Sequence, residues 1–267
     1  MQPAIKMALR TARQSSEFLR TQFERLEPVT TNAETALKQM QAIEKGLYDN
    51  CLEQLQRAYR QHYFAPMGDL EAGSHTQSWH IFPLMGATNY LRGLPEFGLA
   101  LVQKQNNRVE NAVLVCPVLD EEYCVSRGYG ATMNGRRIRA SGSQHLSQAI
   151  VASNLISRLP ANRDALAYGE TMAALGQAAG GIRGTDFTLL EMARVASGRM
   201  DGAVLRIEDA VDAAVGGLLA NECGGLASDF SGNPLTAASS ECVMANNRLF
   251  KELLKTIHPF ASRLRQG

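Results

Sequence analysis

The sequence lacks an excess of charge of either sign. Its 267 residues carry 27 Lys and Arg against 26 Asp and Glu, so the formal net charge is +1. A chain of this balance creates no long-range field that would draw it onto nucleic acid or a membrane surface. A local basic patch is still compatible with the composition.

The sequence also lacks an apolar run that approaches the ~18 residues of a membrane-spanning helix. Its first residues, 1–17, carry charges throughout and contain no apolar signal-peptide core. These absences predict no membrane partner and a cytoplasmic location.

Cysteine is scarce and irregularly placed. The number of cysteines is odd, their spacing is not that of a metal site, and their neighbours are apolar. We therefore expect buried, reduced thiols. The five cysteines are Cys51, Cys116, Cys124, Cys223 and Cys242.

The composition that is present, 45% hydrophobic and 20% charged, is typical of a globular protein. Apolar residues recur at helical spacing over 5–26 and again over 33–60. Pro28 predicts the end of the first helix. Strands are expected at 79–82, 97–102, 109–116 and 122–126, and Asn134-Gly135 predicts a tight hairpin turn.

After Ser141, strands and helices alternate along the chain. Gly198 stands where a left-handed helix cap belongs. Asn246 or Asn247 is expected to cap the last helix, and Pro259 to end it. The expected strands are 149–154, 181–183, 203–205, 226–229 and 241–245, and the expected helices are 165–178, 187–197, 210–222 and 248–257.

No internal repeat, long linker or low-complexity segment divides the sequence. The pattern predicts one α/β domain over residues 1–267. Its first part, 1–145, is of α+β type, and its second part, 146–267, is of α/β type.

One segment, residues 79–90, carries a specific motif. It reads Trp-His-Ile-Phe-Pro-Leu-Met-Gly-Ala-Thr-Asn-Tyr and resembles the signature Trp-x-Ile-Asp-Pro-Leu-Asp-Gly-Thr-x-Asn-Phe of the inositol monophosphatase family. Further segments match family motifs in the family's order: 94–97, 115–122, 128–137, 195–202 and 222–230.

This resemblance implies the family's five-layer αβαβα sandwich. Within the family the chain is most similar to the bacterial SuhB branch, through residues 1–3, 8–13 and 253–259. That branch implies a Nus factor that joins NusA and RNA polymerase in ribosomal RNA antitermination, often as a dimer.

The family binds catalytic magnesium through carboxylates, and most of these are missing here. A Glu-Glu pair aligns with Met67-Gly68, and the two aspartates of the signature align with Phe82 and Met85. Phenylalanine has no donor atom, and a thioether is too soft to suit magnesium. Asp212 alone retains a carboxylate, although a carboxylate at a helix start is more often a cap or a partner of the helix dipole.

Other family positions have changed as well. The phosphate cradle corresponds to Gly86, Ala87 and Thr88, where the threonine hydroxyl of the family is replaced by Ala87. A substrate-binding segment corresponds to 186–189, a sugar-binding glutamate to Leu205, and a water-orienting aspartate to Ala33. We expect no cofactor, and an old pocket filled by apolar side chains.

Nearby carboxylates offer a rebuilt magnesium site as an alternative, although they are more often solvated loop charges. The candidates are Glu34, Asp69, Glu71, Glu208 and Asp209. A second open point is a basic group, Arg136, Arg137 and Arg139, which suits RNA, an acidic protein or plain solvent. The histidines show no ligand spacing, and His80 is expected to be a surface residue or a satisfied one.

The leading hypothesis is therefore a non-catalytic family member that acts by binding NusA or RNA polymerase, as a homodimer. The alternative is a magnesium-dependent phosphatase that acts on inositol 1-phosphate or a related sugar phosphate. A third reading is a sensor that binds a small anion at the helix start beside Gly86.

Overall fold

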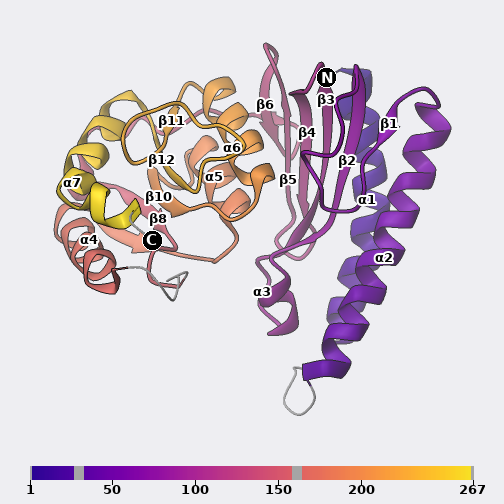
Figure 1. Ribbon diagram of the computed structural model, residues 1–267, viewed down its shortest axis with the longest axis horizontal. Helices are drawn as coiled ribbons and strands as arrows, with labels where there is room; N and C mark the ends of the chain where they lie inside the picture. Colours follow the sequence, from indigo (N-terminus) through magenta and orange to yellow (C-terminus); the bar gives the residue numbers. More distant parts are fainter. Residues whose placement is uncertain (1, 27–32, 158–163, 266–267) are drawn as a thin grey trace. The chain divides into compact units, whose positions relative to one another are not determined.

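The computed structural model describes residues 2–26, 33–157 and 164–265. The chain divides into two compact units, Met1–Arg137 and Ile138–Gly267 (Figure 1). The boundary predicted from the sequence between its two parts lies later, at 145/146. In the structure the boundary follows Arg137 because Arg136–Arg137 forms the last strand of the first sheet. That the whole chain behaves as one domain stays a prediction.

The first unit is a seven-stranded sheet with long helices on one face (Figure 1). The strands neighbour one another in chain order, and all pairs are antiparallel except β1 with β2. The elements are α1 (Pro3–Glu24), α2 (Ala33–Ala58), β1 (Tyr63–Phe64), β2 (Gln77–Met85), α3 (Ala87–Leu91), β3 (Gly98–Gln105), β4 (Arg108–Cys116), β5 (Glu121–Ser126), β6 (Gly130–Met133) and β7 (Arg136–Arg137).

The core of the first unit lies between this sheet and the two helices. Helix α1 packs over β3, β4 and β5, and α2 packs over β2. Successive side chains of a strand point to opposite faces, so alternate residues of each strand meet the helices. The buried contacts are Ile5, Ala8, Leu9 and Ala12 of α1, Cys51 and Leu55 of α2, and Trp79, Ile81, Leu99, Leu101, Val113, Val115 and Cys124 of the sheet.

The second unit is a five-stranded mixed sheet with helices on both faces (Figure 1). The strand order is β11-β12-β10-β8-β9, and β8 is parallel to both of its neighbours. Helices α4 and α7 cover one face, and α5 and α6 the other. The elements are η1 (Leu146–Gln148), β8 (Ile150–Ser153), α4 (Ala165–Ala178), β9 (Gly181–Arg183), α5 (Thr188–Ala196), β10 (Gly202–Arg206), α6 (Ala210–Glu222), β11 (Leu226–Ser228), β12 (Glu241–Ala245) and α7 (Asn247–Arg265).

Most expected elements are present, and the mixed α/β class is confirmed. The layers of the two units, helix and sheet in the first and helix, sheet and helix in the second, are those that a five-layer sandwich requires. Gly198 has the expected left-handed conformation, with φ of 70°. Asn246 caps α7, since its side-chain oxygen accepts from the backbone N–H groups of Arg248 and Leu249. The five cysteines are free and buried, as predicted.

The predicted end of the last helix at Pro259 is wrong, because α7 continues to Arg265. A proline inside a helix removes one backbone hydrogen bond and costs about 3 kcal/mol. Ile257, Ala261 and Leu264 are buried in one core on both sides of the proline. Their burial offsets that cost. The predicted stop at Pro28 lies outside the described residues.

The sequence also missed the shortest elements, β1 and η1, which offer too few residues for a periodic pattern to emerge. Within the described part of the chain, no helix is long and apolar enough to cross a membrane.

Candidate functional site

Strand β2 carries the motif positions of the first unit. Trp79 and Ile81 point to the helices, so Phe82 points to the opposite face of the sheet. Phe82 is 7% exposed. Its cross-strand neighbours form an apolar row through Ala100, Leu114, Tyr123 and Met133. A carboxylate at position 82 would therefore enter an apolar row, and the phenyl ring that stands there completes it.

Strand β2 leads into the start of α3, where the resemblance places the phosphate cradle of the family. The pairing register shifts between Phe82 and Met85, and Met85 is only half-buried. Gly86 follows with φ of 74° and is the N-cap of α3. Ala87 is half-buried and Thr88 is exposed. Helix α3 has five residues, and its dipole is correspondingly small.

Met67 lies in the loop that follows β1, and its side chain is 45% exposed. The loop runs beside β2, because the backbone N–H of Gly68 donates to the carbonyl of Ile81 at 3.0 Å. The structure thus brings the loop that carries Met67 alongside the strand that carries Phe82. Phe82 and Met85 were expected to fill the old pocket, and Phe82 is buried as expected whereas Met85 is only half-buried.

The carboxylates near Met67 belong to the same loop. Asp69 is exposed, and its Oδ1 accepts from the backbone N–H groups of Glu71 and Ala72, both at 2.8 Å. This pattern is a local turn in which the carboxylate shapes its own loop. Glu71 is exposed. The structure therefore favours a loop role for Asp69 over the role of a metal ligand.

Two buried side chains, His80 and Lys104, form hydrogen bonds to backbone carbonyl groups of this loop. His80 on β2 is fully buried, and its Nδ1 lies 2.7 Å from the carbonyl oxygen of Asp69. Since a carbonyl only accepts, Nδ1 carries the proton, and Nε2 accepts from the Ser78 hydroxyl at 2.8 Å. Lys104 on β3 is also buried, and its Nζ donates to the carbonyl of Leu70 at 2.9 Å. His80 is thus the satisfied residue that was expected.

The environment of His80 and Lys104 lowers the pKa of both side chains. Burial lowers the pKa of His80, and the nearby charge of Lys104 lowers it further, although the hydrogen bond to Asp69 acts in the opposite sense. Burial also lowers the pKa of Lys104, against the attraction of Glu71 and Asp69. His80 is therefore held in its neutral form with one defined tautomer.

The remaining ligand candidates lie in the second unit, at the start of α6. Asp209 is the N-cap residue, and Asp212 lies in the first helical turn. Asp212 is 4% exposed, whereas Glu208 and Asp209 are exposed. The acidic first turn suits the positive end of the helix dipole. Burial, together with the charge of Asp212, raises the pKa of the Cys242 thiol.

Leu205 and segment 186–189, which the resemblance aligns with substrate-binding positions, lie in the second unit. Leu205 is fully buried on β10. Segment 186–189 leads into α5: Asp186 precedes the helix with φ of 58°, and Thr188, its first residue, is buried. Asn154 joins the ends of β8 and β10, since its side chain accepts from the N–H of Arg206 and donates to the carbonyl of the same residue. These contacts brace the strand ends.

The basic group is split between the units. Arg136 and Arg137 form the exposed edge strand β7 of the first unit. Arg139 belongs to the second unit, where its guanidinium donates to the carbonyl of Glu222 at 3.4 Å. The early positions Ala33 and Glu34 lie at the start of α2, and their side chains are outside the described part of the chain. Among the described residues, no group of three or more His, Cys, Asp or Glu has the arrangement of a metal site.

Comparison with known proteins gives a consistent result. The model of the inositol monophosphatase family matches residues 1–261. The Nus factor SuhB of Pseudomonas aeruginosa is 35% identical over 266 residues, which cover 97% of each chain. The Nus factor SuhB of Escherichia coli is 29% identical over 256 residues, or 95% of each chain.

Solved structures show the same fold. The extragenic suppressor protein SuhB of Bartonella henselae superposes with a TM-score of 0.79 at 20% identity, and covers 96% of this chain and all (100%) of its own. The IMPase of Thermotoga maritima superposes with a TM-score of 0.80 at 21% identity, over 98% of this chain and 100% of its own.

The burial of Phe82 predicts a contrast in stability. Phe82→Asp places a carboxylate in the apolar row and should lower the free energy of unfolding by about 3 kcal/mol or more. Met67→Asp changes an exposed position and should stay within about 0.5 kcal/mol of the parent. Urea unfolding of both variants in metal-free buffer checks this. Equal stability of the Phe82→Asp variant and the parent would contradict the placement of Phe82 in the row.

The neutral state of His80 predicts a dependence on pH. Below the ordinary histidine pKa of about 6.5, the unfolded chain takes up a proton at this position more readily than the folded protein. Stability should therefore fall as the pH falls from about 6.5 to the lowered folded pKa. In His80→Gln, which cannot take up the proton, the slope of unfolding free energy against pH should be smaller.

The control for this experiment is His145→Gln, which makes the same change at an exposed position and should keep the slope of the parent. Burial lowers the pKa of His62 too, so part of the slope should survive in His80→Gln. If the slopes of His80→Gln and the parent coincide, His80 is not the neutral, buried group that its hydrogen bonds indicate.

Proposed function

Because this chain belongs to the inositol monophosphatase family, we propose that it uses the family's fold to bind another protein and does not hydrolyse phosphate esters. In this proposal it acts in the cytoplasm as a Nus factor, binds NusA or RNA polymerase in ribosomal RNA antitermination, and forms a homodimer. Relatives that are similar over nearly the whole chain carry the name Nus factor SuhB.

The single observation that carries the proposal is the side-chain chemistry at the motif positions. Uncatalysed hydrolysis of phosphate monoesters is so slow that an enzyme must accelerate it by up to ~10²¹-fold. Metal ions supply much of that acceleration, because they activate water and neutralise phosphoryl oxygens. Met67, Phe82 and Met85 offer no oxygen for a hard cation. The residues present do not fit magnesium.

Neighbouring carboxylates support the same proposal. A rebuilt magnesium site would need several oxygen ligands directed at one point. The carboxylate of Asp69 already accepts from its own loop, and Asp212 lies in the first turn of a helix. Asp212 nevertheless retains the family's carboxylate in a buried position, and this is the observation that favours the alternative, a magnesium-dependent phosphatase for inositol 1-phosphate or a related sugar phosphate.

The proposal predicts that the purified protein does not turn over inositol 1-phosphate with magnesium. Phosphate release should stay at the level of buffer, beside the IMPase of Thermotoga maritima assayed as the positive control. Calorimetric titration should find no magnesium site tighter than about 1 mM. A turnover near ~1 s⁻¹, within the ordinary range of enzymes, would overturn the non-catalytic proposal and favour the phosphatase.

The partner role predicts a specific co-purification. A tagged copy expressed at its native level should recover NusA or RNA polymerase subunits from its own cells, and a tag-only strain should not. Light scattering on the purified protein should give the mass of a dimer. Recovery of neither partner by a folded bait would contradict the Nus factor role, and a monomer mass would contradict the homodimer.

A further inference from the structure

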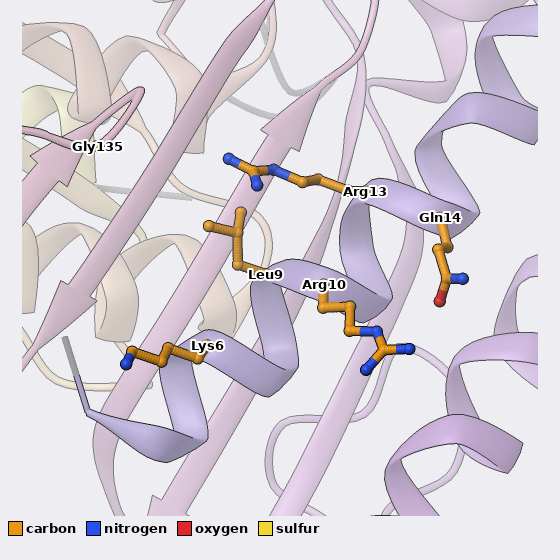
Figure 2. Close-up of a pocket in the computed structure, with 6 residues that line it drawn as sticks. All are labelled: Lys6, Leu9, Arg10, Arg13, Gln14 and Gly135. Carbon is orange, nitrogen blue, oxygen red and sulfur yellow. The ribbon is translucent and has the colours of Figure 1, made fainter.

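A hollow of about 520 Å³ lies on the exposed side of helix α1 in the first unit. It is lined by Lys6, Leu9, Arg10, Arg13 and Gln14 of α1 and by Gly135 at the hairpin turn between β6 and β7 (Figure 2). We refer to these six residues as the α1 hollow. None of them aligns with a metal ligand or with the phosphate cradle of the family, although Gly135 lies in the motif segment 128–137 and Leu9, Arg10 and Arg13 lie in segment 8–13.

Three cationic side chains line the α1 hollow, and of these only Arg13 is paired with a carboxylate, that of Glu122. Lys6, Arg10 and Arg13 follow one another at helical spacing, so their positions lie on one side of α1. In Figure 2 the side chains of Lys6 and Arg13 extend towards the hairpin that carries Gly135, and that of Arg10 extends away from it. Lys6 and Arg10 are exposed, and their side chains form no hydrogen bond or ion pair with the residues that the structure describes. Arg136 and Arg137, both exposed, follow Gly135 directly. The surface is therefore basic although the whole protein is nearly neutral.

Hydrogen bonds connect helix α1 to strand β5, and β5 to the hairpin turn, on the two sides of the α1 hollow. Arg13 binds both carboxylate oxygens of Glu122 on β5, at 2.7 and 2.6 Å, which is the strong bidentate arrangement. The Asn134 side chain accepts from the N–H of Glu122 and donates to the carbonyl of Asp120. The helix and the hairpin turn are thus preorganised on either side of the hollow, which reduces the entropy lost on binding.

The floor of the α1 hollow is apolar. Leu9 is 7% exposed and packs into the core beneath α1. The aliphatic stems of Lys6, Arg10 and Arg13 add apolar surface below their charged ends (Figure 2). A ligand that fits this site carries negative charge at the rim and an apolar group at the centre.

We propose that the α1 hollow docks an acidic segment of a partner protein, with carboxylates on Lys6 and Arg10 and one apolar side chain over Leu9. This deepens the proposed function, because it names the surface that holds the partner.

The surroundings favour a polypeptide over RNA. Exposed Glu17 continues the same side of α1 one turn beyond Arg13, and Asp120 lies exposed beside Arg20. A nucleic acid that followed the helix would meet these carboxylates, whereas specific nucleic-acid binding uses longer basic stripes. A short acidic segment ends before it reaches them.

The test is fluorescence polarisation with a labelled, helix-forming peptide that has Glu at i, i+4 spacing and one central Leu. Comparison probes are the same peptide with Gln for each Glu and a single-stranded RNA of equal length. The acidic peptide should bind, and added salt should weaken it. The double change Lys6→Glu, Arg10→Glu should weaken binding by at least about tenfold.

The matched control is Lys251→Glu, Lys255→Glu, which reverses two exposed lysines at the same helical spacing on α7. This control should bind like the parent. Lys6 and Arg10 are exposed, so their reversal should leave the melting temperature unchanged, and the milder Lys6→Gln, Arg10→Gln variant serves if it does not. Binding that is equal in both charge-reversal variants, absent in the parent, or stronger for the RNA overturns the proposal.

The outcome is separable from that of the Nus factor role. If the parent and the Lys6→Glu, Arg10→Glu variant co-purify equally with NusA or RNA polymerase, the partner role stands and the α1 hollow is not its docking surface. If the parent recovers neither protein but binds the acidic peptide through Lys6 and Arg10, the docking surface stands and the Nus factor role fails.

Discussion

The side chains of β2 alternate between the face that packs against α1 and α2 and the opposite face. The rest of the first unit depends on this constraint. Trp79 and Ile81 are fully buried against these helices. Once they are committed to that face, His80 and Phe82 must point to the other. A shift by one residue would move the tryptophan to the opposite face, away from the helices, so packing fixes which side chains reach the motif face.

This constraint also explains how a family fold persists where the family chemistry has changed. The loop that carries Met67 is held by contacts to its backbone, from Gly68 to β2 and from His80 and Lys104 to its carbonyl groups. None of these contacts involves the side chain at position 67. The path of the loop therefore does not depend on which side chain stands at position 67.

A separation of surfaces follows from the same architecture. The motif face of the first sheet lies opposite its helices, and the α1 hollow lies on the outer side of one of those helices. Binding to a partner through α1 would thus be free to persist after Phe82 entered the motif face, since the sheet and its core separate the two.

The limits of the sequence are clearest in particular residues. The signature at 79–90 predicted where the motif positions lie, and strand alternation predicted that Trp79 and Phe82 face opposite sides. The basic side of α1 carried a signal too, since Lys6, Arg10 and Arg13 stand at helical spacing beside an apolar face. That signal was missed because basic residues on a helix usually only meet solvent.

The sequence by itself determined the family, the α/β class and most of the elements, because motif residues and periodic patterns are local. The tertiary structure alone decided that Phe82 is buried and Met67 exposed, that Asp69 is occupied by its own loop, and that α7 runs through Pro259. Each of these outcomes depends on atoms distant in the sequence or on a competition of packing against hydrogen bonding. A short sequence pattern carries no information about contacts between residues that are distant in the chain.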